Sequence, residues 1–389
     1  MKAVVLSAGR DRSARRRHPW ILSGAVARVE GEPAAGDLVA LRSAEGELLG
    51  HGHFEPGSQI RVRLLAFGKE PEPEGALAER VRAAVARRAG DVLLAGTDAL
   101  RLVNAEGDGL PGLVVDRYAG VLVLRPSTAG MLRGAQGLAR TLAAATGAAA
   151  GLLRPDTVAL RRAGVAAEPS VLWGAAPAAP VEIGERGRRY RVDVAHGQKT
   201  GFYLDQRDAR DLVQSLAAGR CVLDAFAYSG GFAVAALHGS AARVLAIESS
   251  ESALALAREN LAFAGDRAAC RAGDAFEVLR GGAEGYDLVI LDPPPLAKRK
   301  SDVAKASRAY KDLLLHAFRG AAPGRLVLAF ACSHHVSPAL FAKIAFGAAL
   351  DASRRVALLR ELGAPSDHPV SLAHPEGRYL SGLLLRVDA

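Results

Sequence analysis

An apolar stretch that ends in an acidic residue and a glycine turn could build a cofactor site. Residues 222–232 read Val-Leu-Asp-Ala-Phe-Ala-Tyr-Ser-Gly-Gly-Phe, so a strand ending in Asp224 runs into a turn at Gly230 and Gly231. About 20 residues further on, a second apolar run ends in Glu248. Glycine lets the backbone approach a ligand closely. A carboxylate at this spacing can accept hydrogen bonds from ribose hydroxyls.

A third apolar run ends in Leu291-Asp292-Pro293-Pro294. The two prolines remove two backbone donors and stiffen the chain, so the preceding carbonyl groups stay free to bind an amine or a ring nitrogen of a base. Together with the glycine turn and Glu248, this motif favours methyl transfer from S-adenosylmethionine to a planar, nitrogen-containing base.

A nicotinamide dinucleotide site is the alternative for the same segment. Its fingerprint is Gly-x-Gly-x-x-Gly, with a helix N-terminus that faces a pyrophosphate. Here Asp224 would repel a pyrophosphate but could bind the ammonium group of methionine. Phe226, Tyr228 and Phe232 also occupy positions where a phosphate turn needs small residues. The sequence therefore favours the methyl donor.

Cys332 is the candidate nucleophile. It follows the apolar run 326–331 and precedes Ser333-His334-His335, so it should lie at the ligand-bearing edge of a sheet. A thiolate that adds to carbon 6 of a pyrimidine makes carbon 5 nucleophilic. The alternative is a buried cysteine that serves as a small hydrophobe, which suits Cys221 and Cys270 better. A pair of histidines without a third ligand is weak support for a metal site.

The composition indicates a basic protein without a membrane span. The 389 residues include 50 Lys and Arg against 41 Asp and Glu, a formal net charge of +9. No apolar run is long enough to cross a bilayer, and no signal peptide is visible. The three widely spaced cysteines form neither a disulfide framework nor a zinc pattern. These features favour a cytoplasmic, nucleic-acid-binding protein, although a GC-rich genome that favours Arg would produce the same charge.

Residues 1–68 read as short strands separated by glycines, which predicts a small β-barrel-like module with strands at 3–6, 25–30, 37–42, 48–53 and 60–65. Arg15, Arg16 and Arg17 belong to a basic cluster beside His18-Pro19-Trp20. These cations could meet an RNA backbone while Trp20 stacks on a base. A solvated basic loop that Trp20 anchors to the core is the equally weighted alternative.

Two boundaries follow this module. Pro71-Glu72-Pro73-Glu74-Gly75 is a natural linker, and the Ala- and Pro-rich residues 174–180 form the second boundary. Residues 75–178 between them predict a small α/β domain, with helices at 76–88 and 131–146 and strands at 101–106, 112–118 and 121–125.

Residues 181–389 alternate between strands and helices, which predicts a mostly parallel, doubly wound sheet. The expected strands are 190–194, 221–226, 244–248, 286–292 and 326–331, and the expected helices are 208–217, 252–263 and 306–318. Ligands of such sheets bind beyond the carboxyl ends of the strands. Asp224, Glu248, Asp292 and Cys332 all lie at such ends, and Asp274 follows a further short strand.

Several motifs carry a resemblance that runs over nearly the whole chain. They are Arg17-His18-Pro19-Trp20 with Ser23-Gly24-Ala25, residues 106–113 with Asp116-Arg117, residues 198–207, Arg308-Ala309-Tyr310-Lys311-Asp312, Asp367-His368-Pro369 and Pro375-Glu376-Gly377. With Asp-Pro-Pro and Cys332, these segments closely resemble the bacterial class I large-subunit rRNA (cytosine-5) methyltransferases. The resemblance implies an α/β fold: a Rossmann-like class I methyltransferase domain (181–389), preceded by a PUA domain (1–68) and a central α/β domain (75–178).

The resemblance also implies S-adenosylmethionine as cofactor and 23S rRNA, or an assembly intermediate that contains it, as substrate. The implied catalytic residues are Cys332 and Asp292. The residues expected at the RNA, including one candidate base for proton removal, are Pro293, Pro294, Lys298, Arg299, Trp20, Arg15, Arg16, Arg17 and Glu376. Those expected at the cofactor are Phe202, Asp205, Gln206, Arg207, Asp224, Phe226, Tyr228, Ser229, Gly230, Gly231, Glu248, Ser249, Asp274, Ala275 and Asp292.

The chain departs from the family pattern at three places: Ala227-Tyr228-Ser229, Ala331, and Pro295-Leu296, where an aromatic residue often follows Asp-Pro-Pro. The last change affects the pocket for the target base. We expect an S-adenosylmethionine-dependent enzyme that forms 5-methylcytosine through an adduct between Cys332 and carbon 6. Methylation of another rRNA base, such as guanine, and a non-catalytic RNA-binding assembly factor stay open as alternatives. No metal is expected, and the oligomeric state is left open, with a homodimer as one option.

Overall fold

Alternating apolar residues build a six-stranded sheet at the start of the chain. Its strands are β1 (Ala3–Leu6), β2 (Trp20–Leu22), β3 (Val26–Glu30), β4 (Leu38–Arg42), β5 (Leu48–Phe54) and β6 (Ile60–Phe67), in the order β2-β6-β5-β4-β1-β3. Five of these strands were predicted. The basic segment contains a short helix, α1 (Arg12–Arg15), and strand β2, neither of which was predicted. Three residues are too few to show an alternating pattern, so β2 forms only because it pairs with β6.

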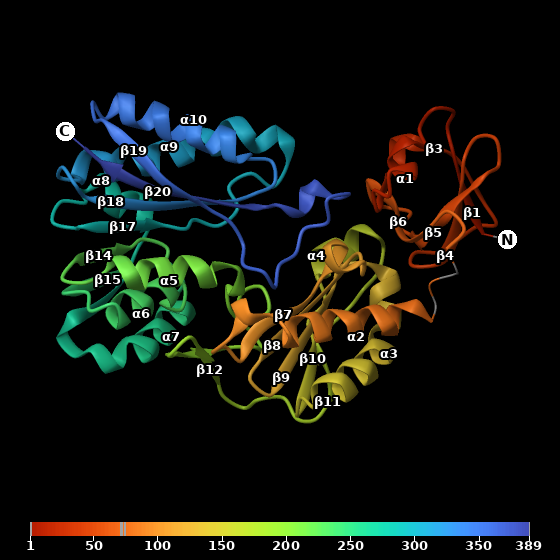
Figure 1. Ribbon diagram of the computed structural model, residues 1–389, viewed down its shortest axis with the longest axis horizontal. Coiled ribbons are helices and arrows are strands. Elements are labelled where there is room, and N and C mark those ends of the chain that lie inside the picture. Colours follow the sequence, from red (N-terminus) through yellow and green to blue (C-terminus); the bar gives the residue numbers. More distant parts are fainter. Residues whose placement is uncertain (1, 71–72, 74, 389) are drawn as a thin grey trace. The chain divides into compact units, whose positions relative to one another are not determined.

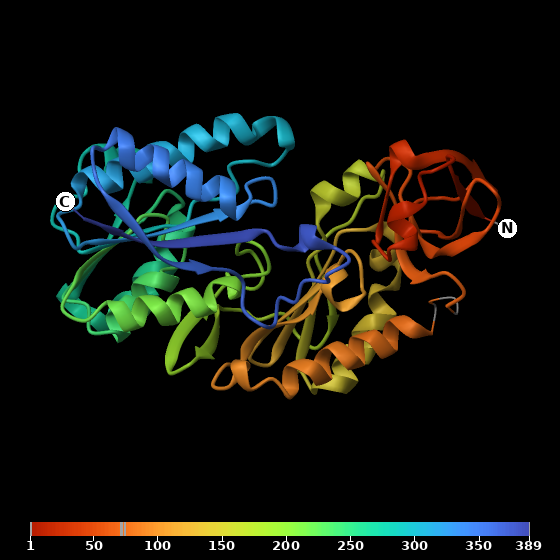
Figure 2. The same cartoon turned by 45° about the horizontal axis from the view of Figure 1, so that its top comes forward.

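A second sheet follows, with the order β11-β10-β9-β8-β7. Its elements are α2 (Ala76–Ala89), β7 (Ala99–Asn104), β8 (Leu113–Tyr118), β9 (Val121–Pro126), α3 (Ala129–Thr146), β10 (Ala150–Leu153), α4 (Thr157–Arg162) and β11 (Ser170–Trp173). Helices α2 and α3 pack against each other and against the sheet (Figure 2). Strand β7 ends earlier than expected because a 3₁₀ turn, Ala105–Asp108, follows it, and Asp108 accepts the N–H of Asn104 at 2.7 Å.

The seven-stranded sheet of the C-terminal half is mostly parallel, as predicted. Its order is β16-β15-β14-β17-β18-β20-β19, and β20 runs antiparallel to both of its neighbours, β18 and β19. The strands are β14 (Cys221–Asp224), β15 (Arg243–Glu248), β16 (Ala268–Ala272), β17 (Leu288–Leu291), β18 (Leu326–Cys332), β19 (Val356–Leu362) and β20 (Leu380–Val387).

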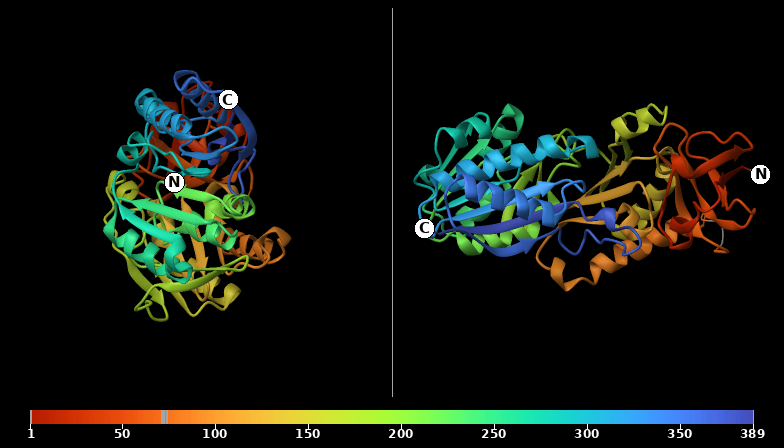
Figure 3. Two further views of the ribbon diagram at one scale, coloured as in Figure 1. Left: turned by 90° about the vertical axis from the view of Figure 1, so that its left-hand side faces the viewer. Right: turned by 90° about the horizontal axis from the view of Figure 1, so that it is seen from above.

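Helices cover both faces of this sheet, which confirms the doubly wound architecture. On one face lie α8 (Ala275–Arg280), α9 (Val303–Gly320) and α10 (Pro338–Asp351), and on the other α5 (Arg207–Leu216), α6 (Gly231–His238) and α7 (Glu251–Leu261) (Figure 1). Helices α9 and α10 run side by side over the sheet (Figure 3). Their apolar faces bury Leu314, Phe318 and Phe341 against strand residues such as Val289 and Val327.

The computed structural model describes residues 2–70, 73 and 75–388, so Pro71, Glu72 and Glu74 of the expected linker lie outside the described residues. The chain forms two units. The N-terminal unit comprises Met1–Ile183, Asp193–Gly201 and Ser366–Gly377, and the C-terminal unit comprises Gly184–Val192, Phe202–Pro365 and Arg378–Ala389. Three stretches of 181–389 therefore belong to the N-terminal unit, namely residues 181–183, 193–201 and 366–377, and the bounds of the three expected domains stay predictions. Across the described ranges, helices long and apolar enough for a bilayer span are not found.

A buried ion cluster joins the first strands of the C-terminal unit to α5. Strands β12 (Val181–Glu185) and β13 (Arg188–Val192) pair with each other and carry Glu185 and Arg188. The fully buried carboxylate of Glu185 accepts hydrogen bonds from Arg188 at 3.0 Å and from Arg210 at 2.7 and 2.5 Å. Burial would raise the pKa of Glu185, but Arg210, Arg207 and Arg188 together lower it. The carboxylate therefore stays charged inside the fold.

Replacing Glu185 with Gln should destabilise the C-terminal unit strongly, because it leaves buried guanidinium groups without their counter-charge. We expect the free energy of unfolding to fall by about 3–5 kcal/mol, measured by urea unfolding. Asp388→Asn breaks the exposed pair with Arg386 and should cause no measurable change. A similar small effect of both variants would contradict a structural role of the Glu185 cluster.

Candidate active site

Four chemically active side chains lie at one edge of the seven-stranded sheet. Asp224 ends β14, Glu248 ends β15, Asp292 follows β17 and Cys332 ends β18. Strand β14 is flanked by β15 and β17, and all four strands run parallel. The sheet thus brings together residues that the sequence separates by more than a hundred positions.

The turn between β14 and α6 is tight and requires its glycines. Gly230 has a φ of 82°, a conformation that side chains disfavour. A Cβ on Gly231 would lie 3.3 Å from the ring of Phe202. Tyr228 also adopts a positive φ of 49°, and its N–H donates to Glu248 at 2.9 Å. The turn therefore presents backbone groups beside two carboxylates.

Asp224 is buried with only half of its carboxyl group satisfied. The N–H of Ala233 donates to Oδ2 at 3.1 Å, whereas Oδ1 has no hydrogen-bond partner among the described residues. Burial raises the pKa of Asp224 to about 8; the N–H of Ala233 opposes this rise, and the neighbouring Asp292 and Glu248 add to it. Such a group can accept a hydrogen bond from a cationic ligand and gain a counter-charge from it.

Glu248 and Asp274 make local hydrogen bonds at the same edge. The Oε1 atom of Glu248 accepts the N–H of Ser250 at 2.8 Å and the hydroxyl of Ser249 at 3.2 Å. Asp274 caps helix α8 by accepting the N–H of Phe276 at 2.8 Å, and Ala275 begins that helix. Each carboxylate oxygen has two lone pairs, so both acids can still accept hydrogen bonds from a ligand.

Asp292 links the candidate nucleophile to a buried amide. The thiol of Cys332 donates to Oδ1 of Asp292 at 3.5 Å, and Nε2 of Gln206 donates to Oδ2 at 2.9 Å. Cys332 is a free, partly buried thiol. The sequence predicted that Cys332 and Asp292 would meet at the sheet edge, and the strand order places them there.

Three tyrosines that the sequence analysis left without a role lie around this pair. Burial raises the pKa of Tyr203, and the nearby Asp292 and Cys332 raise it further. Burial and the proximity of Cys332 likewise raise the pKa of Tyr310. The hydroxyl of Tyr379 donates to Asp205 at 2.5 Å. Tyr203 and Tyr310 lie in motifs noted above, whereas no local signal pointed to Tyr379.

The other residues expected at the cofactor have defined neighbours. The ring of Phe202 lies 5.0 Å from that of Tyr190 and under the guanidinium of Arg210 at 4.5 Å. Phe226 meets Phe276 edge-on at 5.9 Å. Ser229 is buried, and its carbonyl accepts a hydrogen bond from Asn260 at 2.9 Å. Arg207 is fully buried, with its Nε 3.7 Å from Glu185, so it belongs to the ion cluster.

The loop after Asp292 exposes basic side chains. Pro293 is buried while Pro294, Lys298 and Arg299 are exposed. The N–H of Arg299 donates to Asp302 at 2.9 Å and thereby helps to begin helix α9. The charged groups of Lys298 and Arg299 are therefore exposed on a loop whose backbone this hydrogen bond fixes, which suits contact with phosphates.

The basic cluster of the N-terminal unit is largely paired with acids. Arg15 binds Asp11 and Glu47, each at 2.6 Å, and Arg17 binds Glu70 at 2.6 Å. Arg16 is exposed.

The indole of Trp20 is held within the same unit. It donates to Glu106 at 2.7 Å and lies against His374, with the ring centroids 4.4 Å apart. Both partners lie outside residues 1–68, and the stacking of Trp20 on a base stays a prediction.

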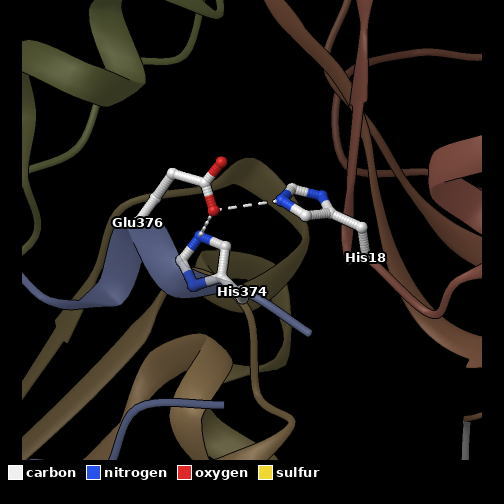
Figure 4. A group of neighbouring side chains, drawn as sticks. All are labelled: His18, His374 and Glu376. Atoms are coloured by element: carbon white, nitrogen blue, oxygen red, sulfur yellow. Dashed lines mark hydrogen bonds and ion pairs between the residues drawn. The ribbon is translucent and has the colours of Figure 1, made fainter. Parts of the chain in front are cut away.

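Glu376 lies in a cluster with His18 and His374 in the N-terminal unit (Figure 4). The ligand atoms of the three side chains lie within 4.8 Å of one another. However, Nδ1 of His18 accepts the N–H of Trp20 at 3.1 Å, so its neutral ring carries the proton on Nε2. That Nε2 donates to Glu376 at 3.1 Å and has no lone pair for a metal ion. The tautomer makes this cluster a hydrogen-bonded network.

Comparison with known sequences identifies two matching families. The family of S-adenosylmethionine-dependent methyltransferases matches residues 101–369, and a PUA-like domain matches residues 4–67. The chain is 39% identical over 392 residues to "Ribosomal RNA large subunit methyltransferase I" of Shewanella denitrificans, with 99% of both proteins covered. The protein of the same name from Aeromonas hydrophila is 38% identical, again with 99% of both covered.

Solved structures share the fold over the full length. SMU.776, a candidate methyltransferase complexed with SAH, has a TM-score of 0.85 at 20% identity, and all of both chains is covered. A candidate S-adenosylmethionine-dependent methyltransferase from Streptococcus mutans has a TM-score of 0.83 at 20% identity, again over all of both chains. With the family matches, these structures confirm the predicted fold class.

Asp224→Asn should change how the stability of the ligand-free protein depends on pH. The folded pKa of about 8 lies above the ordinary value of 3.8. The stability that depends on protonated Asp224 is therefore fully present below the ordinary pKa and is lost as pH rises through the folded pKa. The loss is at most about 1.4 kcal/mol per pH unit. Asn stays neutral, so as pH rises from the ordinary to the folded pKa, the free energy of unfolding of the variant should increase relative to that of the wild type, measured by urea unfolding. Asp274→Asn, at an exposed position that Asn caps equally well, is the control. Parallel pH profiles of Asp224→Asn and wild type would contradict the raised pKa.

Proposed function

Because the chain belongs to the S-adenosylmethionine-dependent methyltransferase family, we propose that it methylates the large-subunit ribosomal RNA and forms 5-methylcytosine in 23S rRNA. The relatives named for this RNA are similar over 99% of the chain, and the PUA-like match covers residues 4–67. The finer assignment, to carbon 5 of cytosine, depends on the pair formed by Cys332 and Asp292.

The sheet edge fits the cofactor. Asp224 offers a buried, unpartnered oxygen, which suits the ammonium of the methionine moiety. A Cβ on Gly231 would crowd the ring of Phe202 at 3.3 Å, and a turn built from glycines lets a ligand approach the backbone closely. We assign Glu248, at the end of the neighbouring strand β15, to the ribose hydroxyls, and Asp274 lies one strand further. When bound, S-adenosylmethionine supplies an electrophilic methyl group.

The observation that carries the cytosine assignment is the 3.5 Å contact from the Cys332 thiol to Asp292. Carbon 5 of cytosine is a weak nucleophile until a thiolate adds at carbon 6. A methyltransferase acting on an amine or a ring nitrogen needs no such thiol. Since Asp292 accepts the thiol hydrogen, it is placed to take that proton as the sulfur adds.

We derive the following order of steps from this pair. Asp292 takes the thiol proton while the Cys332 sulfur bonds to carbon 6, and the displaced electron pair reaches ring nitrogen 3, which Asp292 then protonates. The electron-rich carbon 5 takes the methyl group. Asp292, ionised again, removes the proton from carbon 5, the carbon 5–carbon 6 double bond forms, and the sulfur leaves. Asp292 returns its proton to the Cys332 thiolate beside it, and nitrogen 3 releases its proton to solvent, so one proton is released per methyl group.

Asp292 is our choice for proton removal over Glu376. Asp292 contacts the thiol directly and is held by Gln206. Glu376 instead accepts the proton of His18. Burial would raise the pKa of Glu376, but its own backbone N–H and His18 lower it. A carboxylate with a lowered pKa is a weaker base than one with its ordinary pKa.

A target RNA that carries 5-fluorocytosine should trap the proposed adduct, because fluorine cannot leave carbon 5 as a proton. Wild-type protein should form a covalent complex with this RNA that survives denaturing electrophoresis. Cys332→Ala should form no complex and transfer no methyl group, while its dissociation constant for S-adenosylmethionine stays within about twofold, since the thiol faces the base.

Cys221→Ala and Cys270→Ala are matched controls that should still form the adduct, with stability losses of on the order of 1 kcal/mol. Full methylation by Cys332→Ala would refute covalent catalysis. The chemistry would then move to a nitrogen of another base, such as guanine. Absence of any methyl transfer by the wild type would instead favour a binding factor.

Arg16 should contribute more to RNA affinity than Arg17, because Glu70 already neutralises Arg17. Each phosphate contact adds roughly 0.7–0.9 to the slope of log affinity against log salt concentration. We expect Arg16→Gln to lower this slope by about that amount and Arg17→Gln to lower it less, in filter-binding titrations with rRNA fragments. An unchanged slope in Arg16→Gln would show that this cluster does not contact the RNA.

A further inference from the structure

The carboxamide of Gln206 is buried with one end paired and the other free. Gln206 is 1% exposed and ends the 3₁₀ turn Leu204–Gln206 before α5. Its Nε2 donates to Asp292 at 2.9 Å. Its Oε1 is buried and has no hydrogen-bond partner among the described residues. A buried acceptor without a donor is costly, which indicates that a ligand supplies the donor.

Asp292 fixes which end of the amide is free. An ionised carboxylate accepts hydrogen bonds and donates none, so the NH₂ end of Gln206 must face it. Turning the amide over would set oxygen against oxygen and leave the NH₂ group unpaired. The free end of Gln206 is therefore held as an acceptor.

The neighbouring residues keep this acceptor in place. Asp205, directly before it, is 3% exposed and accepts the hydroxyl of Tyr379 at 2.5 Å. Arg207, directly after it, is fully buried beside Glu185. A polar group fixed on both sides can discriminate between ligands, because it cannot adapt to a wrong one.

The acceptor also lies close to the proposed nucleophile. The carboxylate that binds Gln206 through Oδ2 binds the Cys332 thiol through Oδ1. A pyrimidine attacked at carbon 6 by Cys332 would therefore lie next to the carboxylate that also binds Gln206. Cytosine carries an amino donor on carbon 4, and uracil carries a carbonyl oxygen there.

The ammonium of the methionine moiety is the other donor to consider. Asp224 offers that cation a buried, unpartnered carboxylate oxygen, which binds a cation more strongly than an amide oxygen does. This leaves Gln206 for the base.

We propose that Oε1 of Gln206 accepts a hydrogen bond from the amino group on carbon 4 of the target base and thereby selects cytosine over uracil. This inference rests on the proposed function, since it takes cytosine carbon 5 as the methylated atom. It gives Gln206 a role in specificity in place of the expected role at the cofactor.

The test compares three RNAs that differ only at the target position, which carries cytidine, uridine or pyrimidin-2-one ribonucleoside, a base without a substituent on carbon 4. Single-turnover methyl transfer by the wild type should be roughly 10- to 100-fold faster on cytidine than on pyrimidin-2-one, and uridine should be the poorest substrate. In Gln206→Leu the ratio between cytidine and pyrimidin-2-one should fall toward one.

The ratio distinguishes two roles of Gln206. If Gln206 only held Asp292 in position, its loss would slow transfer to all three RNAs equally and leave the ratio unchanged. Gln214→Leu on helix α5 alters an amide whose oxygen accepts a hydrogen bond from Arg188 of β13, and this variant should keep the wild-type ratio. The wild-type ratio needs no variant, so it tests the proposal even if Gln206→Leu fails to fold.

Three results would overturn the proposal. A wild-type ratio near one, or an unchanged ratio in Gln206→Leu, refutes recognition by Gln206 while leaving methylation of cytidine intact. An unchanged ratio with a tenfold or greater rise in the dissociation constant for S-adenosylmethionine assigns the acceptor to the ammonium. No transfer to cytidine by the wild type overturns the proposed function and this inference with it.

Discussion

The site is built around a carboxyl group that the fold buries without a counter-charge. Asp224 lies at the end of the central strand β14, flanked by the strands that carry Glu248 and Asp292, and one of its oxygens is unpartnered among the described residues. Burial raises its pKa to about 8. Elsewhere the same chain neutralises buried acids: Glu185 binds two arginines directly. The unpartnered oxygen of Asp224 lies at the sheet edge, where a cationic ligand can stabilise it.

Tight backbone geometry maintains that arrangement. Gly230 adopts a positive φ, and Gly231 fits beside the ring of Phe202 because it has no Cβ. Helix α6 can therefore begin soon after Asp224, and the N–H of Ala233 reaches the carboxylate. The N–H of Tyr228 satisfies part of Glu248 from the same turn. One short segment therefore orients both acids. Backbone donors suit this task because they do not change charge with pH.

Hydrogen bonds between distant segments of the chain orient the side chains of Asp292 and Cys332. Asp292 receives the amide of Gln206 on one oxygen and the thiol of Cys332 on the other. Tyr379, at the start of the last strand, holds Asp205 next to Gln206. The site thus draws on four segments that are far apart in the sequence, and the strands next to Asp292, Cys332 and Tyr379 are neighbours in the sheet. In the N-terminal unit, by contrast, acids neutralise exposed cations: Arg15 pairs with Asp11 and Glu47, and Arg17 pairs with Glu70.

Apolar periodicity was enough to locate β14, β15, β17 and β18 and to place Asp224, Glu248, Asp292 and Cys332 at their ends, because parallel strands share one carboxyl edge. It was also enough for the parallel fold, since alternating strands and helices admit few arrangements. The short strand β2 and the antiparallel pair β19 and β20 were missed, because pairing partners far along the chain stabilise them. Side-chain partners were beyond reach for the same reason: the contacts of Gln206, Tyr379 and Glu376 depend on which segments the folded chain brings together, and spacing along the sequence carries no record of that.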